Sequence, residues 1–318
     1  MTKEIPVDLA KYKGLKAKRN ELKIDEKEIG KALDYLQNSR AKIITVNKPA
    51  KLGNRIEIDF EIRLAGVKIE NGISKNHPLI LGKSHFVPGF EKELEGMSAG
   101  QEKEFSLKIP VDWPDKTIAD KQLDFKVKMN LVQERELPEI NDDFAKSLGN
   151  LESLSALKNS IKDGLMQEKE TREKERIRIE LIEKIADESK MEIPENLIIE
   201  ELEVMVSELK TSINELGLDF EKYLSETKTT IDEFKKRWRQ QAEKRIRVDL
   251  CLRAIAKKEQ IDVSDEEITE RINQDLKYYG SAEQAKKDID LKKLEEYTKN
   301  VLLNEKVFAL LEREAEII

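Results

Sequence analysis

The sequence predicts an α+β protein in which an antiparallel sheet surrounds a short helix and an all-α helical domain follows. Apolar and polar residues alternate in several segments between residues 41 and 133, as in strands that bury one face. Beyond Pro138 the apolar residues recur with a period of about 3.6, which indicates helices. At 318 residues the chain is too long for one small core. We therefore expect a linker and a helix that packs on the helical body at 1–40, the sheet domain at 41–135 and the helical domain with its arms at 136–318.

Composition narrows the class of protein. Charged residues make up 39% of the chain and aromatic residues only 5%, which favours long helices with solvated faces. The excess of 65 acidic over 58 basic residues, a net charge of -7, argues against nucleic acid as the main partner. The single cysteine, Cys251, excludes an internal disulfide and a cysteine-rich metal site. Because no signal-like segment and no long apolar run occurs, we expect a cytoplasmic protein with no membrane partner.

The N-terminal part combines a charged segment with a helix. Residues 1–24 suit an extended linker that lies over another surface. Asp25 and Glu28 have the spacing of a capping box and begin a helix that runs through about Asn38. A strand is expected at 41–46.

The sheet domain is predicted from strict alternation. Arg55–Leu64 is the clearest strand, and the same pattern recurs at 105–109 and 123–131. Between these strands, a Pro-Gly turn leads into a short helix in which Phe90 and Leu94 lie four residues apart on one face. We expect the sheet to wrap around that helix.

The second half of the chain reads as helices. A stripe of apolar residues predicts a long helix from about 152 to 189, and Pro194 begins another that ends near Gly217. Capping boxes at Thr230 and Ser264 begin two more, which end near Lys258 and Tyr279, and a broken segment at 281–290 precedes a last helix at about 291–314.

The segment Ile80–Gly100 contains a distinctive order of residues: Leu81-Gly82, Phe86-Val87, Pro88-Gly89, Phe90 and Gly96-Met97-Ser98-Ala99-Gly100. In this order the segment resembles the central segment of FKBP-type peptidyl-prolyl isomerases. The alternative is a generic strand, turn and helix.

The second half contains three distinctive segments: Glu134–Ile140 with Asp143–Lys146, Ile193–Ile198, and Arg237–Ile246 running into Ile255–Glu259 and Val263–Glu267. With them the second half resembles the trigger factor family, chaperones that carry an FKBP-like domain on a helical body, and Pro6–Leu15 is similar to the linker that enters the isomerase domain. The family's N-terminal ribosome-binding domain, with its Gly-Phe-Arg-x-Gly-Lys-type loop, has no counterpart here, so we expect no stable ribosome docking by this chain.

The resemblance implies a chaperone that binds unfolded or nascent polypeptides and has peptidyl-prolyl cis-trans isomerase activity. No Gly-rich phosphate loop is found, so we expect the protein to work without ATP, and we expect no cofactor. A non-catalytic interaction protein, in which the FKBP-like domain only binds, is the alternative.

Prolyl isomerisation requires neither a nucleophile nor a metal ion. The barrier is about 18–20 kcal/mol of amide resonance, and a dry aromatic pocket with a hydrogen-bond donor can favour the twisted amide. His77 and Ile69 stand where the family usually has aromatic residues, which implies a shallower pocket and weak activity. Strand alternation alone would bury Phe60 and Phe125, so a core role for them stays open. By resemblance the catalytic pocket comprises Phe60, Ile69, His77, Phe86, Val87, Phe90, Trp113 and Phe125, with Glu70 near the position of the family's acidic residue.

Two further expectations concern metals and clients. We expect no metal site, since His77 and His85 are the only histidines and no ligand cluster accompanies them. Met205, Leu209 and Ile213 are candidates for exposed, substrate-binding contacts on the helical arms. The alternative is that these three side chains pack between helices.

Overall fold

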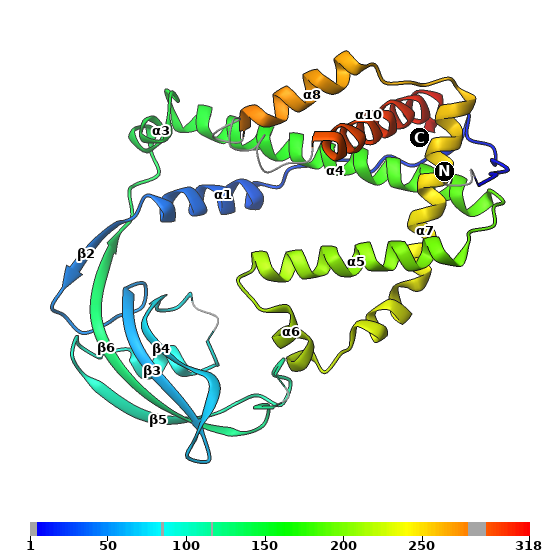
Figure 1. Ribbon diagram of the computed structural model, residues 1–318. Helices are drawn as coiled ribbons and strands as arrows, with labels where there is room; N and C mark the ends of the chain where they lie inside the picture. Colours follow the sequence, from blue (N-terminus) through cyan, green and yellow to red (C-terminus); the bar gives the residue numbers. More distant parts are fainter. Residues whose placement is uncertain (1–4, 84–85, 116, 279–290) are drawn as a thin grey trace. The chain divides into compact units, whose positions relative to one another are not determined.

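The computed structural model describes residues 5–83, 86–115, 117–278 and 291–318 (Figure 1). The chain divides into two compact units, which are described separately. Lys23–Met166 form the first, here called the sheet unit, and Met1–Leu22 with Gln167–Ile318 form the second, the helical unit. The α+β class predicted from the sequence is confirmed. The contact-based units divide the chain at other points than the three expected segments, whose boundaries stay a prediction.

The sheet unit is built on a five-stranded antiparallel sheet. Its strands are β2 (Lys42–Val46), β3 (Arg55–Leu64), β4 (Val67–Ile80), β5 (Glu102–Lys108) and β6 (Gln122–Glu136). The order is β2-β6-β3-β4, and β5 also pairs with β6. The long strand β6 pairs with β5 through its first half and with β2 through its second half, which Figure 1 shows as one continuous ribbon. The expected strands are confirmed, but the alternation did not reveal most of β4.

The core of the sheet unit lies under the short helix α2 (Phe90–Leu94). Phe90 and Leu94 are both fully buried, as their shared helical face predicts. The other core residues come mainly from the inward positions of β3 and β6, because successive side chains of a strand point to opposite faces. These are Ile56, Ile58, Phe60, Leu123, Phe125, Val127, Met129 and Val132.

A second, smaller core lies outside the sheet. Helix α1 (Glu26–Ser39) begins at the predicted capping box of Asp25, and α3 (Asp142–Leu148) follows β6. Sequence analysis missed α3, whose start is marked by Asn141 accepting a hydrogen bond from Phe144 N at 3.0 Å. This core contains Ile29, Leu33, Phe144, Ala145 and Leu157.

The helical unit contains most of the helices. Helix α4 (Leu154–Glu188) continues into it from the sheet unit, and α5 (Glu195–Glu215), α6 (Phe220–Thr227), α7 (Ile231–Lys258), α8 (Asp265–Tyr278) and α10 (Leu291–Glu314) follow. The predicted helices are confirmed to within about two residues, which is the usual uncertainty of helix ends. Helix α6 was not predicted. The broken segment expected at 281–290 lies outside the described residues.

The main core of the helical unit joins α4, α7 and α10. Ile185 of α4, Ile255 of α7 and Val307 of α10 are fully buried there. Cys251 is also fully buried, and this burial raises the pKa of its thiol, so it is a small core residue as predicted.

The N-terminal segment lies along this helical core. Asp8 and Lys190 exchange backbone hydrogen bonds of 2.9 and 3.0 Å, and strand β1 (Lys16–Ala17) pairs in parallel with β7 (Glu316–Ile317) at the C-terminus. The Tyr12 hydroxyl donates to Glu259 Oε1 at 2.7 Å, and burial with this carboxylate raises the pKa of Tyr12 to about 12. The segment is therefore an ordered part of the helical unit.

Candidate functional site

The predicted pocket residues come from β3, β4, β6, α2, the turn before α2 and, for Trp113, the loop between β5 and β6. Antiparallel pairing sets Ile58 opposite His77, Phe60 opposite Val127, and Ile62 opposite Phe125. Residues directly opposite each other in an antiparallel pair share one face of the sheet. The strand register therefore brings His77 and Phe60 to the face that α2 covers.

Phe90 is the centre of an aromatic group, here called the ring cluster, made of Phe60, His77, Phe86, Phe90, Phe105 and Phe125. Phe86 stacks on Phe90 with 4.2 Å between ring centroids and planes 13° apart. Phe125 and Phe105 contact Phe90 at 5.3 and 5.7 Å, and Phe60 lies edge-on at 6.5 Å. Offset and edge-on pairs at these distances stabilise one another beyond the area they bury.

Three rings of the cluster meet edge to face. The centroids of Phe60 and His77 are 5.4 Å apart, those of Phe60 and Phe86 5.3 Å, and those of His77 and Phe86 5.6 Å. The interplanar angles are 76°, 90° and 82°. His77, expected to weaken the pocket, thus takes the place of an aromatic ring within it.

Exposure divides the predicted residues into two groups. Phe90, Phe125 and Phe60 are buried, with 0%, 2% and 8% of their surface exposed. The core role that the sequence left open for Phe60 and Phe125 is therefore confirmed. Glu70 belongs to β4, but its side chain lies outside the described part of the structure. The half-buried members are Ile69, Phe86, Val87 and Trp113, which pack against the same core, and His77, which contacts its Phe60.

Helix α2 is held at both ends by side chains that sequence reasoning did not single out. With 5 residues it is too short to be stable alone. At its start Glu91 accepts a hydrogen bond from the backbone of Gly82, and Gly89 adopts a left-handed φ of 92° as the N-cap. At its end Lys103 of β5 donates to the carbonyl of Glu93 at 2.7 Å and pairs with the Glu93 carboxylate at 2.8 Å. These contacts fix the position of Phe90.

The ring cluster provides an apolar surface that excludes water, and it contains no hydroxyl or thiol nucleophile. Its one titratable ring is His77. Among the described residues, no group of three or more His, Cys, Asp or Glu side chains is placed to hold a metal ion. In the same part of the chain, no helix is long and apolar enough to cross a membrane.

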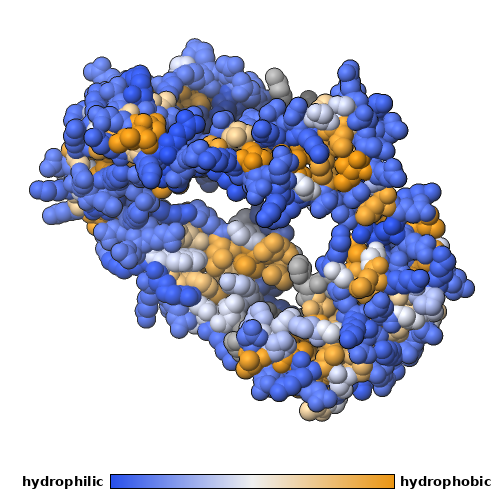
Figure 2. Space-filling model, turned by 180° about the vertical axis from the view of Figure 1, so that it is seen from behind, coloured by the Kyte–Doolittle hydropathy of each residue, from blue (hydrophilic) through white to orange (hydrophobic). Residues whose placement is uncertain are grey.

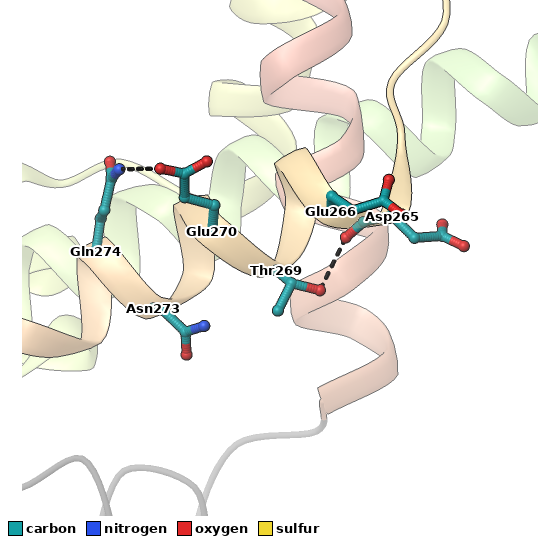
Figure 3. Close-up of a pocket in the computed structure, with 6 residues that line it drawn as sticks. All are labelled: Asp265, Glu266, Thr269, Glu270, Asn273 and Gln274. Carbon is teal, nitrogen blue, oxygen red and sulfur yellow. Dashed lines mark hydrogen bonds between the residues drawn. The ribbon is translucent and has the colours of Figure 1, made fainter.

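The helical unit contains two hollows of another kind. One, of about 550 Å³, lies on the surface of α8 and is shown in Figure 3. All six lining residues drawn there belong to this one helix, and the marked bonds, from Thr269 to the carbonyl of Asp265 and from Gln274 to Glu270, run along it. Among the described residues, no side chain from another element lines it. The other, of about 1710 Å³, lies between residues 5–9, α5 and α7, and its wall mixes apolar and charged residues.

The expectation of exposed client contacts at Met205 and Ile213 is wrong. These residues are only 5% and 7% exposed, because they pack in two small cores between α5, α6 and α7, and Leu209 is half-buried there. Other side chains of this region are open to solvent. Figure 2 shows an apolar patch, in orange, along α5. The exposed apolar residues of α5 and the turn after it are Ile199, Val204, Leu216 and Leu218.

Comparisons with known proteins identify both parts of the chain. The family described as "Bacterial trigger factor protein (TF) C-terminus" matches residues 153–312, and the family described as "FKBP-type peptidyl-prolyl cis-trans isomerase" matches residues 46–130. The trigger factor of Caldicellulosiruptor saccharolyticus is 33% identical over 300 residues, which cover 94% of this chain and 68% of that protein. The chain belongs to the trigger factor family.

Further trigger factors agree with this assignment. That of Agathobacter rectalis is 36% identical, with 86% of this chain and 62% of the relative covered. That of Clostridium kluyveri is 31% identical, with 98% and 73% covered. The chain thus spans 62% to 73% of the length of these trigger factors.

A solved structure has the same fold. It is described as "Promiscuous Substrate Recognition in Folding and Assembly Activities of the Trigger Factor Chaperone", and it superposes with a TM-score of 0.51 at 24% identity. The superposition covers 98% of this chain and 73% of that one. The predicted FKBP-like sheet domain and helical domain of the trigger factor fold are confirmed.

Proposed function

We propose that this trigger factor chain is an ATP-independent chaperone that binds unfolded or nascent polypeptides and isomerises their prolyl peptide bonds in the sheet unit. The observation that carries the isomerase part is the ring cluster centred on Phe90. Membership of the trigger factor family and the match of residues 46–130 to FKBP-type isomerases support it.

The chemistry asked of the cluster is stabilisation of a twisted amide. A proline ring held against aromatic rings is removed from water, and an amide that has lost its resonance is less polar than a planar one. A dry aromatic site therefore binds the transition state better than the ground state. In this mechanism Phe90 is the ring against which the proline packs, the half-buried His77 borders the site, and Phe60 contacts both of these rings.

The test is an isomerisation assay on an Xaa-Pro peptide with the full chain. Phe60→Leu should lower kcat/KM about tenfold, because Phe60 is the ring that contacts both His77 and Phe86. The control is Phe105→Leu, a half-buried ring that contacts Phe90 and Phe125 but belongs to neither edge-on contact. If the folded wild-type chain is no faster than buffer, the isomerase proposal fails.

The alternative is a module that binds prolyl segments without isomerising them. One observation favours it: Phe90 is fully buried in this structure, so its ring is not open to a substrate. A folded chain that binds the same Xaa-Pro peptide but leaves its isomerisation rate unchanged would establish this alternative.

The chaperone part is supported by the exposed apolar residues of α5 and its following turn. Leu216 and Leu218 are 73% and 54% exposed, and they lie at the end of a helix rich in charge. Exposed apolar side chains that are rimmed by charged residues mark surfaces that can bind other polypeptides.

Aggregation of a model client, with and without the full chain and without ATP, tests this part. Replacing Leu216 and Leu218 by Ser should reduce the suppression of aggregation about threefold, and surface changes of this kind alter folding stability little. Val67→Ser is the matched control, because Val67 is 71% exposed but lies in the β3–β4 hairpin. Equal suppression by all three proteins would contradict the assignment of this surface.

Partners and compartment follow from the same proposal. Unfolded or nascent polypeptides are the proposed partners, and the cytoplasm, where new chains are made, is the proposed compartment. Fractionation of cells that produce the tagged chain, with probes for cytoplasmic and membrane markers, tests the compartment.

A further inference from the structure

Phe86 covers the ring that the isomerase site should present to proline. It stacks on Phe90 at 4.2 Å with the planes 13° apart, the closest and most parallel ring contact that Phe90 makes among those described. Phe90 has 0% of its surface exposed, whereas Phe86 is half-buried. Phe86 is therefore an outer ring that lies on an inner one.

No face of Phe90 is open to a substrate, because 0% of its surface is exposed. Phe125 of β6 and Phe105 of β5 contact it at 5.3 and 5.7 Å. Carbon atoms in contact are about 3.5–4.0 Å apart, so two rings stacked at 4.2 Å have no room between them for a pyrrolidine ring. A proline ring can reach Phe90 only if Phe86 leaves.

Phe86 is held in this place by its edges as well as by its face. Phe60 and His77 meet it at 5.3 and 5.6 Å, with interplanar angles of 90° and 82°. These contacts stabilise the arrangement in which the ring covers Phe90.

We propose that Phe86 fills the position of the substrate's proline ring in the free protein and so sets how readily the isomerase site accepts substrate. This inference rests on the proposed isomerase function and concerns the same site. The open arrangement is a minor state, and the apparent dissociation constant of a prolyl segment is raised by the reciprocal of its population. Phe86 thereby lowers the apparent affinity of every prolyl segment by the same factor.

The test compares steady-state kinetics of the full chain with those of Phe86→Val. Removing the covering ring should lower KM for an Xaa-Pro peptide about threefold to tenfold and raise kcat/KM by the same factor. The matched control is Phe105→Val, which removes another half-buried ring in contact with Phe90, one that belongs to β5. That variant should lose thermal stability and show no rise in kcat/KM. If the wild type is active, a folded Phe86→Val variant with an unchanged or lower kcat/KM would overturn the proposal.

A second measurement does not depend on the folding of a variant or on turnover. The chain is labelled with fluorine on the ring of Phe86, with its sequence otherwise unchanged, and is titrated with the Xaa-Pro peptide. The fluorine NMR signal should shift, because the environment of the ring changes when Phe86 moves. An unchanged signal at saturating peptide would overturn the proposal. An inactive wild type with an active Phe86→Val variant would support a closed site. If both are inactive, the isomerase function fails, and the fluorine titration alone decides whether Phe86 moves on binding.

Discussion

The sheet unit and the helical unit bury their apolar residues in different ways. The sheet unit has a small core between α1, α3 and α4, but most of its buried residues, fifteen with Phe90 and Leu94 of α2 among them, form one core in which the aromatic rings touch one another. The helical unit divides its apolar residues among one main core and two small cores on α5, α6 and α7. In a continuous, close-packed core, a change at one residue affects the packing of the others, including those of the pocket. Helices that are held only by small separate cores can change position at a lower cost in free energy. A binding pocket needs the first arrangement, and a surface that accepts varied clients is helped by the second.

The largest loss of stability should follow from the substitution Phe90→Ala. This change removes the ring that contacts Phe60, Phe86, Phe105 and Phe125, and it should destabilise the sheet unit by about 3–5 kcal/mol. Thermal unfolding of the full chain, followed by near-ultraviolet and far-ultraviolet circular dichroism, measures it. The transition of the helical unit should stay in place. A common shift of both transitions would show that the two units unfold together.

A smaller effect is expected from Lys103→Met. The variant loses the hydrogen bond to the Glu93 carbonyl at 2.7 Å that ends α2, and we expect about 1 kcal/mol of lost stability with a severalfold fall in kcat. Lys103→Arg should restore most of kcat, because the cation and a donor return. The control is Lys126→Met, which breaks exposed ion pairs with Glu102 and Glu104 on the same sheet. Equal losses for Lys103→Met and Lys126→Met would argue against a positioning role.

Low pH should lower the stability of the helical unit, in part by protonating Glu173. Hydrogen bonds from Arg176 and from the Asn20 backbone hold the pKa of Glu173 at about 2, below its ordinary value of 4.5. A group whose folded pKa is lowered stabilises the fold above its unfolded pKa, and this stability is lost as the pH falls from about 4.5 towards 2. Glu173→Gln should flatten the pH dependence of helical-unit stability in that window.

The control for that experiment is Glu168→Gln, which affects an exposed pair with Arg172 on the same helix. Denaturant unfolding of both variants at pH 6, 4 and 3 gives the comparison. If Glu173→Gln keeps the full acid dependence of the wild type, the link between the N-terminal segment and α4 does not depend on this carboxylate.

The last prediction, with the smallest expected signal, concerns binding of the chain to ribosomes. We expect no stable binding by these 318 residues at about 0.15 M salt, where the Debye length is about 8 Å. Lys13 and Lys16, from the basic N-terminal segment, already pair with Glu259 at 2.8 Å and Glu316 at 3.5 Å. Their charge is thus partly neutralised within the helical unit. Sedimentation with ribosomes at low and at physiological salt checks this, and binding that survives the higher salt would reveal a docking surface in this chain.

Local sequence patterns determined most of the elements. The capping boxes at Asp25 and Thr230 are made by residues three apart, so they form wherever the chain lies, and both helices begin there. Alternation likewise predicted that Ile56, Ile58 and Phe60 face inward, because a strand has only two faces. The short helix of Phe90 and Leu94 could also be predicted from residues that are close in sequence. The same holds for the resemblance of Ile80–Gly100 to FKBP-type isomerases.

What the tertiary structure decided depends on residues far apart in the chain. The pattern of α5 shows that Met205 and Ile213 are apolar, but only the positions of α6 and α7 bury them and leave Leu216 and Leu218 exposed. In the same way, sequence placed Phe86 near the pocket but could not show that its ring lies on Phe90. The stacking of two side chains depends on their rotamers and on the strands around them, and no short-range pattern encodes it.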